Sequence, residues 1–95
     1  PARELKAMAD AMRSNASGTV ICLVATDAGK ASIVVSVTDD LIGQMDAVGL
    51  VKAGSAALGG AGGGGRADMA QAGGPNANAA ADAVDAVRQA VLAAG

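Results

Sequence analysis

Residues 19–38 read TVICLVATDAGKASIVVSVT, two apolar, β-branched runs separated by a turn-like segment. The first run, TVICLVA, is continuously apolar, which is typical of a strand covered on both faces. The second run, ASIVVSVT, places Ile33, Val35 and Val37 on one face of a strand. A five-residue connection between the runs favours an antiparallel hairpin. This stretch therefore predicts a β-sheet at the centre of the fold.

A helix is predicted before the hairpin, over residues 2–15, because apolar residues recur there at helical spacing. Its apolar face consists of Leu5, Met8, Ala9 and Met12. Its polar face consists of Arg3, Lys6, Asp10 and Arg13. Because the helix begins at the second residue, we expect the chain to be a piece of a longer protein.

Two more helices and a third strand are predicted after the hairpin. Asp46 is placed to cap a helix over residues 47–58, and its inner face consists of Ala47, Leu50, Val51, Gly54 and Leu58. Glycines bound a short strand over residues 66–74, and a final helix over residues 79–93 carries Val84, Val87 and Val91 at helical spacing. The order α-β-β-α-β-α predicts an α+β fold in which helices pack on a small mixed or antiparallel three-stranded sheet. Residues 1–95 are expected to form one domain.

Composition excludes several kinds of chemistry. The 95 residues contain no histidine, which excludes Ser-His-Asp and Cys-His catalysis and most zinc sites. They contain no Phe, Trp or Tyr, so nucleic-acid bases cannot stack on aromatic rings. Cys22 is the only cysteine and lies in an apolar run, which indicates a buried, unreactive thiol. The net charge of −2 gives no general attraction to phosphates, so nucleic-acid binding needs a local site or help from other domains.

No apolar run reaches the roughly 18 residues that a membrane helix needs, and no secretion signal is recognisable. We therefore expect a soluble, cytoplasmic chain with no membrane partner.

The glycine-rich segment over residues 59–65, GGAGGGG, is the most unusual feature. Backbone N–H groups without side chains can surround an anion, and a nucleic-acid strand can approach them closely. Arg66 follows directly and supplies a guanidinium suited to phosphate or to a guanine edge. A dinucleotide site is disfavoured because a helix precedes the segment and a strand follows it, the reverse of the usual arrangement. A flexible linker is the alternative interpretation.

Residues 58–74 read LGGAGGGGRADMAQAGG. This stretch resembles the Gly-Gly-Lys-Gly-Gly-Gly-Arg-Pro-Asp-Met-Ala-Gln-Ala-Gly-Gly signature of the C-terminal domain of alanyl-tRNA synthetases. The same type of domain occurs beside the catalytic domain of DHH-family phosphoesterases. The leading helix, the hairpin ending in VTDD, the VGLVKAG helix and the closing alanine-rich helix extend the resemblance over nearly the whole chain. The chain departs from the signature where the lysine falls on Ala61 or Gly62 and the proline on Ala67.

The resemblance implies a tRNA-binding domain without catalytic residues of its own. Such domains contact the outer corner of tRNA, where the D and T loops meet, and support aminoacylation and editing by the other domains of the synthetase. The partners expected from it are tRNA(Ala) and those domains, with self-association into a homodimer left open. ATP and zinc are implied for the parent enzyme, and no cofactor is expected in this piece. The expected RNA-binding residues are Gly60, Gly62, Gly63, Gly64, Gly65, Arg66, Gln71, Gly73 and Gly74.

Less specific interpretations remain open at this stage. Arg66 could form an ion pair with Asp68 that merely orders the loop, and the amide of Gln71 could be satisfied beside the sheet. Met69 is expected in the core, and solvated charges are the simplest interpretation of Lys30 and Lys52. At the level of the whole chain, the alternatives are a domain of a DHH-type phosphoesterase and an oligomerisation module that uses an apolar helix face.

Overall fold

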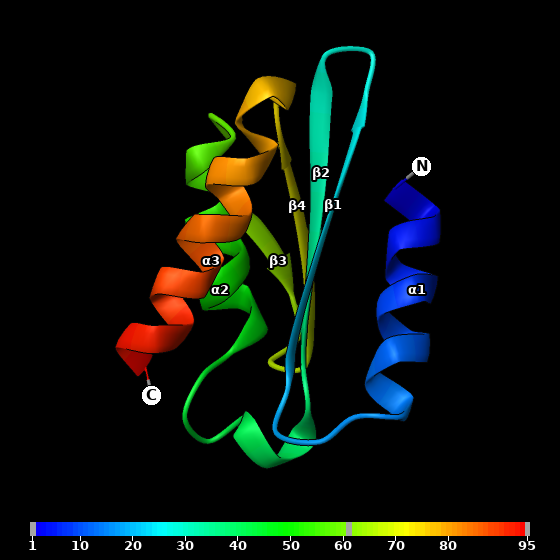
Figure 1. Cartoon of the computed structure of the whole chain (residues 1–95), viewed down its shortest axis with the longest axis vertical. Helices are drawn as coiled ribbons and strands as arrows, with labels where there is room; N and C mark the ends of the chain where they lie inside the picture. Colours follow the sequence, from blue (N-terminus) through cyan, green and yellow to red (C-terminus); the bar gives the residue numbers. More distant parts are fainter. Residues whose placement is uncertain (1, 61, 95) are drawn as a thin grey trace.

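The computed structural model describes residues 2–60 and 62–94 and arranges them as one sheet with helices on both faces (Figure 1). Ala61 and the side chain of Arg3 lie outside the described part. The elements in chain order are α1 (Ala2–Ser14), β1 (Val20–Asp27), β2 (Lys30–Val37), the short helix η1 (Asp39–Leu41), α2 (Ala47–Ala57), β3 (Gly63–Gly65), β4 (Met69–Gly74), the short helix η2 (Ala77–Ala79) and α3 (Ala80–Ala94).

The sheet is antiparallel throughout, with strand order β1-β2-β4-β3. The hairpin between β1 and β2 is tighter than predicted, because Asp27 pairs with Lys30 and leaves only two residues in the turn. Those residues, Ala28 and Gly29, have φ values of 53° and 80°. Positive φ at both positions matches a type I′ turn, whose twist suits the strands on either side. Ala28 accepts this conformation although glycine or asparagine is the usual residue.

The α+β class is confirmed, but the sheet has four strands instead of three. The additional strand is β3, which pairs with β4 so that Gly64 lies opposite Gln71. The predicted strand over residues 66–74 begins only at Met69, because Arg66 and Met69 close a tight turn. The amide of Arg66 donates to the carbonyl of Met69 at 2.7 Å, and the amide of Met69 donates back at 3.2 Å. The end of the glycine-rich segment, Gly63–Gly65, is thus one arm of a second hairpin.

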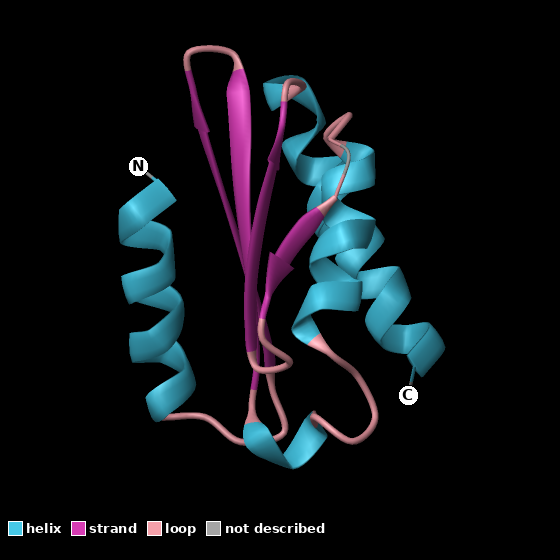
Figure 2. Cartoon of the chain, turned by 180° about the vertical axis from the view of Figure 1, so that it is seen from behind, coloured by secondary structure: helices cyan, strands magenta, loops and turns pink. Residues whose placement is uncertain are grey.

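Helices α2 and α3 cover one face of the sheet and form the larger core with β2 (Figure 2). Ile33, Val35 and Val37 are fully buried there, as their alternation predicts. All five residues of the predicted inner face of α2 are buried as well: Ala47, Leu50, Val51, Gly54 and Leu58. The carboxylate of Asp46 caps α2 by accepting from the amides of Val48 at 2.7 Å and Gly49 at 3.1 Å.

Close approach explains one glycine of α2. A Cβ at Gly54 would lie 2.4 Å from Cδ1 of Ile33 and 3.0 Å from a methyl of Val87, so the absence of a side chain lets α2 sit against both the sheet and α3. Only part of the apolar face predicted for α3 is buried. Val87 is buried, whereas Val84 is 44% exposed, because Ala83 and Val87 face Gly54 of α2 and Val84 borders an open groove beside β1.

Helix α1 lies alone on the opposite face (Figure 1). Leu5 and Ala9 are buried against Ile21, Val34 and Met69, which confirms Met69 as a core residue. Two residues of the predicted apolar face are not buried: Met8 and Met12 are 52% and 50% exposed. Only the narrow stripe of residues one turn apart, Leu5 and Ala9, contacts the sheet, since no further layer covers the flanks of the helix.

Candidate nucleic-acid interface

Strand β3 places the glycine-rich segment at an edge of the sheet. Gly63, Gly64 and Gly65 are exposed. Yet a Cβ at Gly63 would lie 2.6 Å from the Cβ of Ala72, and one at Gly65 would lie 2.4 Å from the carbonyl oxygen of Met69. These two glycines are therefore required by the fold itself. Gly64 differs, because a Cβ built there meets nothing within 4 Å.

The other four glycines proposed for RNA binding are Gly60, Gly62, Gly73 and Gly74, which lie where the segment leading into β3 meets the end of β4. A Cβ at Gly60 would lie 2.1 Å from the carbonyl oxygen of Gly73, and a Cβ at Gly74 would lie 2.4 Å from that of Leu58. The buried hydroxyl of Ser55 lies 3.0 Å from the carbonyl oxygens of both Gly62 and Gly73, which share its single hydrogen. Internal packing accounts for Gly60 and Gly74, and a flexible linker is excluded for this part of the segment because the hydroxyl fixes its position.

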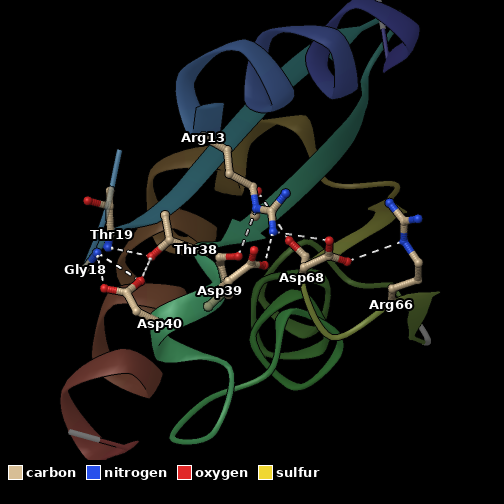
Figure 3. Close-up of polar contacts among 10 residues, drawn as sticks. Arg13, Gly18, Thr19, Thr38, Asp39, Asp40, Arg66 and Asp68 are labelled. Atoms are coloured by element: carbon tan, nitrogen blue, oxygen red, sulfur yellow. Dashed lines mark hydrogen bonds and ion pairs between the residues drawn. The ribbon is translucent and has the colours of Figure 1, made fainter. Parts of the chain in front are cut away.

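Arg66 occupies the turn between β3 and β4, and its side chain is 74% exposed. Its Nε lies 3.3 Å from Oδ1 of Asp68, so the predicted ion pair is present. Asp68 also faces Arg13 of α1, with Oδ2 at 3.3 Å from a guanidinium nitrogen (Figure 3). Arg13 in turn pairs with Asp39 and donates to the carbonyl of Val37 at 3.1 Å. The ion pair therefore orients Arg66 while most of its side chain remains exposed to solvent.

A groove of about 220 Å³ joins these elements. We name it the glycine groove. It is lined by Lys6, Gly64, Gly65, Arg66, Met69, Ala70 and Gln71. Four predicted site residues meet there: Gly64, Gly65, Arg66 and Gln71. The side chain of Gln71 is exposed on the face of β4 beside α1. Gly73 is exposed further along the same strand but does not line the groove.

Lys6 is the residue that the sequence interpretation missed. Its position on the polar face of α1 was predictable, but helical spacing does not reveal which part of the sheet that face overlooks. The structure places this cation across the groove from the turn that carries Arg66. Lys30 and Lys52 are exposed and lie outside the groove.

A second polar cluster connects the start of β1 to η1. The hydroxyl of Thr38 donates to Asp40 at 2.6 Å and accepts from the amide of Thr19 at 3.0 Å, while the amide of Gly18 donates to Asp40 at 2.8 Å (Figure 3). The hydrogen bond from Thr38 is the largest cause that lowers the pKa of Asp40 below its ordinary value of 3.8. Since every member of this cluster has a partner, its role is to hold the end of the hairpin.

The described residues hold few other groups that could react or bind a metal. Burial raises the pKa of the Cys22 thiol to about 11, which keeps it protonated and unreactive at neutral pH. No group of three or more acidic or cysteine side chains in residues 2–60 and 62–94 is placed to hold a metal ion. Within the same ranges, no helix has the length and apolarity required to cross a membrane.

The fold and this groove belong to a recognisable class of domain. Residues 1–93 match the family described as the DHHA1 domain, and the chain belongs to that family. It is similar to the C-Ala domain from Aquifex aeolicus alanyl-tRNA synthetase, with a TM-score of 0.87 and 28% sequence identity over 94% of this chain and 79% of that one.

The chain is also similar in sequence to parts of much longer enzymes. The chain is 57% identical over 91 residues to an alanine–tRNA ligase of Paramagnetospirillum magneticum and 57% identical over 93 residues to one of Mesorhizobium japonicum. These matches cover 96% and 97% of this chain but only 10% of each ligase. The predicted resemblance to the C-terminal domain of alanyl-tRNA synthetases is thereby confirmed.

Proposed function

We propose that this chain is a tRNA(Ala)-binding domain of a cytoplasmic alanyl-tRNA synthetase and that the glycine groove is its contact surface. The main support for this proposal is that Lys6 and Arg66 line the groove together with the exposed amide of Gln71 and the side-chain-free backbone of Gly64. Two cations can each neutralise a phosphate, and the amide can donate to or accept from a base edge or a ribose hydroxyl. A sugar–phosphate chain can lie against Gly64 because no Cβ intervenes.

The groove supplies a local attraction that the whole chain lacks. With a net charge of −2, nonspecific attraction to RNA is weak. We therefore expect modest affinity from the isolated chain and a larger effect when the other domains of the synthetase bind the same tRNA. In that setting the domain supports aminoacylation and editing in protein synthesis, whereas ATP and zinc act at other domains.

The test is the affinity of the chain for a tRNA(Ala) transcript, measured by fluorescence anisotropy at several salt concentrations. Lys6→Ala and Arg66→Ala are each expected to weaken binding and to reduce the salt slope by roughly 0.7–0.9. The matched control is Lys52→Ala, which removes an exposed lysine that does not line the groove and is expected to change neither quantity by as much. Equal losses of affinity in all three variants would show that binding depends only on the overall charge of the chain, and would refute the glycine groove as the contact surface.

The part of the tRNA that is bound needs a separate comparison. A transcript containing the D and T loops is expected to bind more tightly than an acceptor-stem duplex that lacks them. Equal affinity at the same salt concentration would contradict contact at the outer corner, without excluding RNA binding in the groove.

A further inference from the structure

Asp68 lies between two guanidinium groups, one from α1 and one from the turn that joins β3 to β4 (Figure 3). Its Oδ1 is 3.3 Å from Nε of Arg66, and its Oδ2 is 3.3 Å from a terminal nitrogen of Arg13. The side chains of Asp68 and Arg13 are each 25% exposed, whereas that of Arg66 is 74% exposed. Water and salt therefore screen the inner ion pair less than the outer one. The inner pair forms a support from which Arg66 extends into solvent.

The backbone around Asp68 is held on both sides. The carbonyl of Asp68 accepts from the amide of Val37 at 2.9 Å, which ties the turn to the end of β2. Arg66 and Met69 exchange two backbone hydrogen bonds across the same turn. Arg13 is held as well, since its Nε donates to the carbonyl of Val37 at 3.1 Å. The carboxylate of Asp68 is therefore placed by β2, α1 and its own turn without any ligand.

A carboxylate beside an RNA-binding arginine repels phosphate, so its presence there needs a compensating benefit. Arg13 offsets the repulsion, because Arg13, Asp68 and Arg66 together carry two positive charges and one negative charge. Asp39 also pairs with Arg13, but its side chain is 86% exposed and its charge is more strongly screened. The benefit comes from the shape of the guanidinium. Asp68 contacts it at Nε, which leaves the edge between the two terminal nitrogens for two parallel hydrogen bonds to a phosphate.

We propose that Asp68 is a positioning residue for RNA binding, which holds Arg66 so that its two terminal nitrogens face a phosphate in the glycine groove. The proposal rests on the function proposed above for this groove. An exposed arginine loses side-chain freedom when it binds, and that loss weakens binding. Because Asp68 already restricts Arg66 in the free chain, less freedom remains to be lost. Such preorganisation of one long side chain corresponds to a gain in affinity of about two- to tenfold.

The sign of the effect of Asp68→Asn on affinity for a tRNA(Ala) transcript tests the proposal. Asparagine keeps the shape but removes a negative charge, so overall charge alone predicts tighter binding. Positioning predicts the opposite, with binding at least about twofold weaker. The matched control is Asp85→Asn, which removes a carboxylate 2.7 Å from Arg88 outside the groove and is expected to bind as tightly as wild type or more tightly. Urea denaturation followed by circular dichroism verifies that both variants fold. Equal or tighter binding by Asp68→Asn overturns the proposal.

The effect of Asp68 must also depend on Arg66. In a chain that carries Arg66→Ala, Asp68→Asn removes only a negative charge and is expected to tighten binding instead of weakening it. Weakening of similar size in both backgrounds overturns the proposal, because the carboxylate would then act on the fold and not on Arg66. Arg66→Lys leaves Asp68 in place and keeps the charge, but an ammonium group has no second edge. It is expected to bind at least about twofold more weakly than wild type, and equal affinity also overturns the proposal.

The orientation of Arg66 can be measured without RNA, by NMR relaxation of its Nε–H group in the free chain. The order parameter of this group is expected to fall in Asp68→Asn, while that of Arg88 stays unchanged. A wild-type Arg66 as mobile as in Asp68→Asn overturns the positioning role and leaves the proposed function intact. By contrast, Lys6→Ala and Arg66→Ala chains that both bind the transcript like wild type overturn the proposed function itself.

Discussion

One methyl group at Gly60 tests the packing between α2 and the sheet. The backbone of Gly60 does not have a positive φ, so alanine meets no conformational penalty there. The obstacle is contact, because a Cβ would lie 2.1 Å from the carbonyl oxygen of Gly73 and 2.4 Å from Oγ of Ser55. Ordinary carbon–oxygen contacts are more than 1 Å longer than the first of these. Gly60→Ala must therefore displace the loop from β4.

The displacement breaks identifiable hydrogen bonds. The amide of Gly60 donates to the carbonyl of Ser55 at 2.8 Å, and the hydroxyl of Ser55 is 3.0 Å from the carbonyl oxygens of Gly62 and Gly73. At about 1 kcal/mol for each bond lost, plus overpacking, the free energy of unfolding is expected to fall by about 2–4 kcal/mol. For a domain of this size that corresponds to a melting temperature lower by roughly 10–25 °C.

Urea denaturation followed by far-ultraviolet circular dichroism measures this loss, since the chain has no aromatic residue for fluorescence. Gly64→Ala is the matched control because its Cβ enters open space, and stability is expected to stay equal or to rise by about 0.4–1 kcal/mol. A Gly60→Ala chain within about 0.5 kcal/mol of wild type would refute the argument that steric contact requires this glycine.

Three further outcomes are expected. Asp46→Ala removes the cap of α2 and should lower the free energy of unfolding by about 1 kcal/mol in urea denaturation, whereas Asp46→Asn should retain most of it. Because the pKa of Asp40 is lowered in the folded chain, its contribution to the free energy of unfolding is present above pH 3.8 and is lost as the pH falls through the lowered value. Thr38→Val should raise the pKa of Asp40 in an NMR titration, and an unchanged pKa would contradict the assigned cause. With a pKa of about 11 against an ordinary 9.0, Cys22 should react with iodoacetamide about 100-fold more slowly in the folded chain than in urea at pH 7, and equal rates would show that burial does not protect it.

Side-chain periodicity predicted the parts of the fold that depend on burial. The alternation of Ile33, Val35 and Val37 and the inner face of α2 were correct because each pattern follows from a core on one side. The N-cap at Asp46 was correct because its carboxylate interacts locally, with amides two and three residues later. These features require no knowledge of distant contacts.

The glycine strand could not be predicted in this way. Gly63–Gly65 has no side chains to alternate, so its pairing with β4 appears only when the backbone of both is placed. The internal role of Gly60 and Gly74 was missed for the same reason, because the nearest contact of each comes from a residue more than ten positions away, Gly73 for Gly60 and Leu58 for Gly74. Predicting the groove also required the position of Lys6 relative to β4, and the spacing of residues within α1 does not reveal that position.

The sparse attachment of α1 has a consequence for amide hydrogen exchange. Among its described residues only Leu5 and Ala9 are buried, and Arg13 anchors the C-terminal turn to Val37. The first turns of α1 should therefore open by local unfolding well below the free energy of global unfolding. Because Lys6 belongs to those turns, RNA held in the groove should raise the protection of α1 with increasing ligand concentration. Protection of the central strand β2 should rise as well, because a ligand that binds only the folded chain also stabilises it against global unfolding.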